Sequence, residues 1–173
     1  MKKINEIIKD EYYKKTGNNS RLRIAVRALL ENNEHKFAFI HIKGHDDFGN
    51  RDHLETPGGG VDQGEGLQEA LIRELDEELG AQVKIINEVG YIDIEYNLLN
   101  RIDRENYFCC KLENLNHKSH LLDYEKTLFD KIIWLSYDEL IDMLTNYPEV
   151  LVGKMIHKRE KIVFEYAKEH KII

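Results

Sequence analysis

Alternation between apolar and polar residues predicts short β-strands over much of the chain. Arg21 to Leu29 alternates aliphatic residues with arginines, and Lys36 to Lys43 alternates two apolar faces. A two-residue period is that of a β-strand, so we expect these two stretches to form a hairpin around the polar turn between them. Further strands are predicted, in chain order, at Gln82 to Ile86, Gly90 to Tyr96, Tyr107 to Leu112 and Lys131 to Leu135.

Four stretches predict helices, either from apolar residues at helical spacing or from a capping sequence. Ser136 and Glu139 have the spacing of a capping box, and Pro148 prevents that helix from continuing. The polar stretches Gly44 to His53 and Glu113 to Asp130 predict loops, the second with room for a short helix. The other helices are expected at Ile4 to Tyr13, Gly66 to Leu79 and Val150 to His170.

Strands interspersed with helices predict an α/β fold, with helices on both faces of a sheet. The 173 residues give room for one domain with a core and too little for two ordinary ones. We therefore expect a single domain, residues 1–173, consisting of an N-terminal helical extension (1–20), a core (21–144) and a C-terminal helix (145–173). The apolar stripes of the two terminal helices could cap the sheet of a monomer or serve in a homodimer.

The predicted helix from Gly66 to Leu79 carries the most distinctive chemistry. At about 100° per residue, Glu74, Glu77 and Glu78 fall within one arc beside an apolar arc. Two of these glutamates lie in the last turn, where the helix dipole prefers cations, and each like-charge pair costs only ~0.2–0.5 kcal/mol. Local physics therefore leaves two interpretations open, a solvated acidic face or a ligand site.

The flanking glycines favour the ligand site. Gly58, Gly59 and Gly60 precede the helix and permit close approach of a ligand, and Gly80 follows it as a terminating residue. A glycine loop that leads into a carboxylate-bearing helix suits a polyanion held through a divalent metal. Oxygen donors favour Mg²⁺, Mn²⁺ or Ca²⁺ over softer metals.

The spacing of these residues resembles the Nudix box, the signature of hydrolases that act on nucleoside diphosphates linked to another moiety. Gly59 is followed by five residues, Glu65, seven residues and then the run Arg73 to Ala81, with every fixed identity present and Ala81 as a small version of the final aliphatic residue. The resemblance covers roughly Arg21 to Leu144. It implies a Nudix-like α/β/α sandwich with a mixed β-sheet, and it leaves the two ends of the chain unexplained.

The resemblance also implies divalent-metal-dependent hydrolysis of a phosphoanhydride bond. Mg²⁺, or Mn²⁺, would be bound by Glu74, Glu77 and Glu78, and Arg73 would pair with Glu65 in a mainly structural role. Family members differ in their general base, for which Glu78 is the first candidate and Glu125 the second. The catalytic candidates are thus Glu77, Glu78, Glu125 and Arg73, and the expected substrate-binding residues are Gly58, Gly59, Gly60 and Arg27.

The substrate class is left partly open by the sequence. A nucleoside triphosphate or modified nucleotide is favoured, and a dinucleoside polyphosphate or ADP-ribose is the alternative. No proline occurs between Pro57 and Pro148, which counts against ADP-ribose, while Tyr91 and Tyr96 leave the subclass ambiguous. A nucleotide-sensing domain without turnover is the further alternative, and the complete carboxylate set argues against it.

Composition narrows the partners and the compartment. The 25 basic and 32 acidic residues give a formal net charge of -7, so no broad basic field for nucleic acid is implied and such a partner is unlikely. Cys109 and Cys110 are adjacent, which suits neither a disulfide framework nor a zinc site. The N-terminus is too polar for a signal sequence and no long apolar segment occurs, so we expect a cytoplasmic protein without a membrane span.

Overall fold

The computed structural model describes residues 1–115, 128–147 and 151–173. Glu125 and Pro148, both singled out by the sequence, lie outside the described residues. The described part has α/β architecture, as predicted. Its elements are β1 (Arg21–Glu31), β2 (Phe37–Asp46), β3 (Gly49–Glu55), α1 (Leu67–Leu79), β4 (Gln82–Tyr96), β5 (Arg101–Asn114), β6 (Phe129–Leu135), α3 (Tyr137–Asn146) and α4 (Leu151–Glu169).

The strands form a mixed six-stranded sheet in the order β3-β2-β1-β5-β4, with β6 also paired to β2. β1 and β5 run parallel along their lengths, and the other pairs are antiparallel. The predicted hairpin of β1 and β2 is present, but its two strands are paired only beside the turn, at Glu31 and Phe37. The two strands diverge beyond that point, and the edge of β1 becomes available to another segment.

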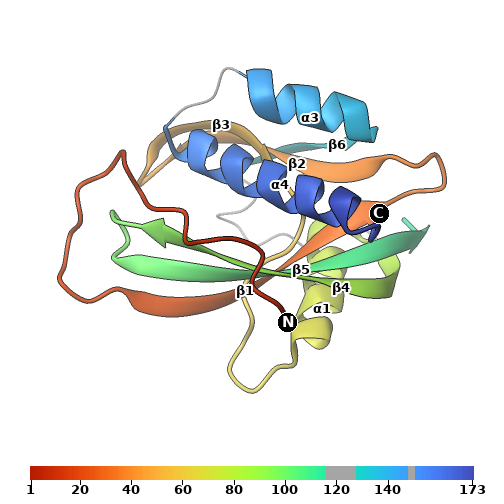
Figure 1. Ribbon diagram of the computed structural model, residues 1–173, viewed down its shortest axis with the longest axis horizontal. Helices are drawn as coiled ribbons and strands as arrows, with labels where there is room; N and C mark the ends of the chain where they lie inside the picture. Colours follow the sequence, from red (N-terminus) through yellow and green to blue (C-terminus); the bar gives the residue numbers. More distant parts are fainter. Residues whose placement is uncertain (116–127, 148–150) are drawn as a thin grey trace.

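Helices cover both faces of the sheet, which gives the predicted α/β/α sandwich (Figure 1). The side chains of α1 pack with Val26, Ala28 and Ile40 on one face. Those of α3 and α4 pack with Leu29 and Phe39 on the other. Successive apolar side chains of β1 and β2 therefore point alternately into two separate cores.

The adjacent cysteines of β5 divide between the two cores. Cys109 belongs to the core beneath α4 and Cys110 to the core beneath α1. Both are free thiols. Burial raises the pKa of Cys109 and raises that of Cys110 to about 12, so both thiols are protonated at neutral pH.

The N-terminal helix predicted for Ile4 to Tyr13 is wrong. This stretch is extended and pairs with the free edge of β4: Ile4 N donates to Tyr91 O at 2.8 Å, and Ile8 N donates to Asp93 O at 2.9 Å. Its apolar residues recur every four positions, a spacing that fits one face of an extended chain as well as one face of a helix. The edge of β4 that faces away from β5 favours the extended form. An extended segment can hydrogen-bond to that edge, whereas a ten-residue helix would leave the N–H and C=O groups of the edge exposed.

Two other predictions need correction. Gly44 to His53, expected to be a loop, contains the end of β2 and most of β3, which pair from Ile40 with Glu55 to Asp46 with Gly49. Its polar residues face one another and a polar interior, so the stretch lacks the apolar alternation by which a strand is recognised. The two strands predicted between Gln82 and Tyr96 are one, β4, whose pairing with β5 is interrupted by irregularities.

The two helices that follow β6, α3 and α4, agree with the sequence patterns. Glu139 N donates to Ser136 Oγ at 3.4 Å and Ser136 N donates to Glu139 Oε2 at 2.8 Å, which completes the predicted capping box. The apolar stripe of α4 and Ile8 are buried within the same chain, whereas Tyr12 of the N-terminal segment is 41% exposed. Self-association stays a prediction. None of the described helices is long and apolar enough to cross a membrane.

We expect Ile8→Ala to lower the free energy of unfolding by about 2–4 kcal/mol, because Ile8 is 5% exposed and the truncation leaves a cavity against β4. Urea unfolding would measure the change. Lys9→Ala, at the exposed neighbouring position, serves as the control and should stay within about 0.5 kcal/mol of the parent. Equal effects of the two substitutions would contradict the docking of the N-terminal segment.

Candidate active site

The glycine segment, residues 57–61, lies along the edge of β1 where β2 diverges. Val26 N donates to Gly59 O at 2.9 Å, and similar backbone bonds flank it on both sides. Gly58 has a φ of 135°, and a Cβ atom there would lie 2.1 Å from Val26 O. Glycine is the residue that allows this backbone geometry and this close approach. The sheet thus fixes the segment through main-chain hydrogen bonds.

Helix α1 packs against the same segment. Leu71, Leu75 and Leu79 are buried and Leu67 is partly buried, whereas Ile72 is 50% exposed. Glu74 is buried and faces the glycine segment so closely that a Cβ atom on Gly59 would lie 2.4 Å from its Oε2. The helix ends at Gly80, whose left-handed conformation agrees with the predicted termination.

Arg73 connects the helix, the loop and the glycine segment. Its Nε and Nη2 donate to the two carboxylate oxygens of Glu65, both at 2.9 Å, which is the predicted pair. Nη2 also donates to Gly60 O at 2.9 Å, and Nη1 donates to Glu74 at 2.9 Å and to Glu77 at 3.1 Å. The long side chain of Arg73 thus folds back over the carboxylates of its own helix. These bonds raise the pKa of Arg73 well above its usual range.

Glu77 and Glu78 occupy different environments. The side chain of Glu77 is 42% exposed and has Arg73 as a partner. Glu78 accepts a hydrogen bond from Gly58 N at 2.8 Å. Burial raises the pKa of Glu78 well above its usual range, and nearby Arg27 and the Gly58 N–H partly oppose that rise. Neighbouring carboxylates of one helix are thereby made chemically distinct.

One cavity of about 610 Å³ brings nearly all of the predicted residues together. Its walls include Gly58 to Val61 of the glycine segment, the α1 glutamates Glu74, Glu77 and Glu78, and both Arg73 and Arg27. Glu125 is the exception among the sequence candidates, because it lies outside the described residues. Acidic and basic side chains therefore share one space, as a metal-polyanion complex would require.

Sequence reasoning missed four charged residues of this cavity, Arg23, Arg51, Glu55 and Asp62. Arg51 and Glu55 lie on β3, most of which falls in the predicted loop from Gly44 to His53, so their common direction could not be foreseen. Arg27 of β1, expected from the sequence to bind substrate, is only 8% exposed. Arg23 and Arg27 donate to Asp103 and Glu105 of β5, respectively. This pairing is visible only once β1 and β5 are known to be parallel neighbours.

The carboxylates of the cavity fit a hard divalent cation. Among the described residues no group of three or more His, Cys, Asp or Glu side chains is gathered closely enough to hold a metal ion as they stand. Glu74 and Glu77 are bonded to Arg73, and Glu78 to Gly58. All three still border the same cavity with oxygen donors, the ligand type that Mg²⁺ and Mn²⁺ prefer.

Comparison with known proteins identifies the family. The NUDIX domain model matches residues 21–153. Together, the fold, the box and the cavity define a pyrophosphohydrolase of the Nudix type. The chain belongs to the NUDIX domain family. A search of curated proteins found no match.

Solved structures agree with the family at the level of the fold. A MutT protein from Methanosarcina mazei Go1 is 18% identical with a TM-score of 0.63, covering 90% of this chain and 99% of its own. A NUDIX hydrolase from Nitrosomonas europaea is 19% identical with a TM-score of 0.60, covering 81% and 89%. An ADP-ribose pyrophosphatase from Streptococcus suis is 15% identical with a TM-score of 0.54, covering 84% and 92%.

His53, between Arg51 and Glu55 on β3, is a buried neutral histidine. Its side chain is fully buried, and its Nδ1 has no hydrogen-bond partner within the described residues. Burial lowers the pKa of His53 to about 3, and the positive charge of Arg51 contributes in the same direction while Glu55 opposes it. The unfolded chain, with an ordinary histidine pKa near 6.5, therefore binds a proton that the folded chain excludes between about pH 6.5 and pH 3.

The contribution of His53 to stability should be present above pH 6.5 and be lost progressively as the pH falls toward 3. Between pH 6.5 and pH 5 it should lower the free energy of unfolding by roughly 1–2 kcal/mol. His53→Gln should remove that part of the pH dependence, measured by urea unfolding at each pH. His45→Gln, at an exposed site, should retain it. Parallel pH profiles for the parent and His53→Gln would refute a buried neutral His53.

Proposed function

We propose that this chain hydrolyses a phosphoanhydride bond of a nucleoside triphosphate or modified nucleotide, with Mg²⁺ or Mn²⁺ as its metal. The observation that supports the proposal best is the shared cavity, which is lined both by three glutamates of α1 and by basic side chains. Carboxylates alone would repel a polyphosphate and arginines alone would need no metal. A cavity with both suits a substrate whose negative charge is divided between metal and guanidinium groups.

Glu74, Glu77 and Glu78 would hold the cation. When bound, a divalent cation neutralises charge on phosphoryl oxygens and makes an attacking water a better nucleophile. Arg73 orients two of these carboxylates and ties them to the glycine segment, which agrees with a mainly structural role. Glu78 stays our first candidate for the general base because it borders the cavity beside Gly58, and Glu125 stays the second.

The rest of the cavity provides for the nucleotide. The glycine segment offers main-chain groups, and Arg23, Arg27 and Arg51 offer cationic donors for phosphate oxygens. Ile42 and Phe129 add an apolar surface for a base. A small nucleotide substrate and two buried reduced thiols also fit a cytoplasmic enzyme.

Turnover of a nucleotide panel tests the proposal. The purified chain would be incubated with Mg²⁺ and nucleoside triphosphates, oxidised nucleotides, dinucleoside polyphosphates or ADP-ribose, and release of phosphate, pyrophosphate or nucleotide would be measured. We expect metal-dependent turnover that is highest for a triphosphate or modified nucleotide. Preference for ADP-ribose or a dinucleoside polyphosphate would replace the substrate assignment. Binding without turnover across the panel would instead support a nucleotide-sensing domain.

Glu77→Gln and Glu78→Gln should each weaken Mg²⁺ binding, and Glu78→Gln should lower turnover by about 10²–10⁴-fold, the range for loss of a general base. Stability of the metal-free protein should change little. In Glu77→Gln the lost pair with Arg73 and the relieved charge in the last helical turn nearly cancel, at ~0.3–0.5 kcal/mol each. Calorimetric titration with Mg²⁺, turnover and thermal unfolding would measure the three properties.

Asp76→Asn is the matched control for these variants, since it removes one charge from the same helix outside the cavity. It should retain Mg²⁺ binding and turnover. Parental turnover in both Gln variants would eliminate the ligand assignment. Loss of the fold would indicate a structural role for the glutamates.

A further inference from the structure

Helix α4 seals the free edge of β3 with side chains. β3 is the outer strand of the sheet, so its outward N–H groups have no neighbouring strand. Leu54 N donates to His157 Nε2 at 3.0 Å, and Thr56 N and Oγ1 donate to Glu160 Oε1 at 3.3 and 3.0 Å. Thr56 directly precedes the glycine segment. The helix therefore holds the point from which that segment departs.

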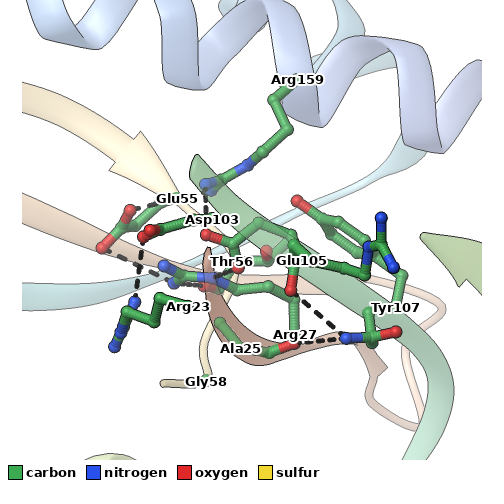
Figure 2. A network of polar contacts seen from close by, with 12 residues as sticks. Arg23, Ala25, Arg27, Glu55, Thr56, Gly58, Asp103, Glu105, Tyr107 and Arg159 are labelled. Atoms are coloured by element: carbon green, nitrogen blue, oxygen red, sulfur yellow. Dashed lines mark hydrogen bonds and ion pairs between the residues drawn. The ribbon is translucent and has the colours of Figure 1, made fainter. Parts of the chain in front are cut away.

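Arg159 extends this contact from α4 toward the cavity, as Figure 2 shows. Its side chain is fully buried, and Nη1 donates to Glu105 Oε1 at 3.2 Å. The other oxygen of Glu105 accepts a hydrogen bond from Arg27 Nε at 3.0 Å. Glu55 stands between the same two arginines, 3.8 Å from Arg159 Nη2 and 3.7 Å from Arg27 Nη1. Two carboxylates thus join an arginine of α4 to an arginine of the cavity wall.

These groups are held in their charged forms. Burial would raise the pKa of Glu55, but Arg27, His53 and Arg159 outweigh it and lower that pKa to about 2. Burial would likewise raise the pKa of Glu105, but Arg27 and Arg159 outweigh it and lower that pKa. Taking such charges out of water is costly, and apolar side chains of similar size would often stabilise a fold as well or better. Stability alone is therefore a weak reason for this arrangement.

The contacts of Arg27 leave one of its nitrogens, Nη2, for an acceptor in the cavity. Nε is bonded to Glu105, and Nη1 donates to Thr56 O at 2.8 Å. Within the described residues no protein group accepts a hydrogen bond from Nη2, and the side chain borders the cavity. A guanidinium fixed on two sides has little freedom to lose when its remaining donors meet an acceptor.

We propose that Arg159 is a positioning residue of the substrate site, which acts through Glu105 and Glu55 to hold Arg27 so that Nη2 meets a phosphate oxygen of the substrate. This inference rests on the proposed function. It makes α4 part of the site, although most of the helix lies beyond the residues that match the family model. The C-terminal helix is then required for substrate affinity as well as for covering the sheet.

Arg159→Lys tests the inference, because it keeps a buried cation but loses the planar group that reaches both carboxylates. We expect KM for the best substrate of the panel to rise about tenfold, the effect of misplacing one hydrogen bond to a charged group, with kcat within about threefold of the parent. Phe164→Leu is the control on the same helix, since Phe164 is equally buried and packs on the rings of Phe37 and Phe39. It should lower the melting temperature and leave KM unchanged.

A double-mutant cycle with Arg27→Lys separates positioning from general support of the fold. If Arg159 acts through Arg27, adding Arg159→Lys to Arg27→Lys should raise KM by less than about twofold further. Additive effects of the two substitutions, a parental KM in Arg159→Lys, or an equal KM rise in Phe164→Leu would each overturn the inference. If Arg159→Lys does not fold, Glu105→Gln interrupts the same connection while keeping the shape of the side chain at residue 105, and the same KM results apply.

Failure of the proposed function would be recognised separately. If the parent turns over no nucleotide, ADP binding would be measured by calorimetry for the parent, Arg159→Lys and Phe164→Leu. If ADP binding is about tenfold weaker in Arg159→Lys and unchanged in Phe164→Leu, the positioning role of Arg159 stands and only the proposed hydrolysis is rejected. Equal ADP affinity in all three chains, or none in the parent, would overturn the positioning role as well.

Discussion

The guanidinium of Arg73 is the constraint on which the site depends. It is bonded at once to the loop carboxylate of Glu65, to the backbone of Gly60 and to two helix carboxylates. Without that cation, α1 would present three like charges near its C-terminal end, where the helix dipole is also unfavourable. The acidic face is tolerated because one residue compensates its charge and fixes its position. The same residue ties the helix to the segment that a phosphate would approach.

The sheet supports that constraint from behind. β1 and β2 diverge after one pair, and the edge so freed binds the glycine segment through main-chain hydrogen bonds. β5, parallel to β1 on its other side, brings acidic residues beside the arginines of β1. One strand therefore positions both the glycine segment and a cationic wall. The described site is therefore assembled around β1 as much as around α1.

The box was predictable because its information is local: fixed spacings, a glycine stop and a helical arc all lie within a short stretch. The fold class and the capping box at Ser136 followed for the same reason. The N-terminal segment was mispredicted because apolar residues four apart suit two structures, and only the distant edge of β4 chooses between them. Glu55 and Arg51 were missed because an edge strand beside a charged interior lacks the apolar alternation that identifies strands.

The neighbouring cysteines of β5 provide built-in reporters for the two layers of the sandwich. Their thiols lie in different cores, one under α4 and one under α1, although they are consecutive in the chain. A thiol-specific reagent can reach each one only when its own layer opens. Separate labelling rates for Cys109 and Cys110 would therefore distinguish detachment of the C-terminal helix from detachment of the box helix. A single protein without added probes can in this way show whether its two faces unfold together.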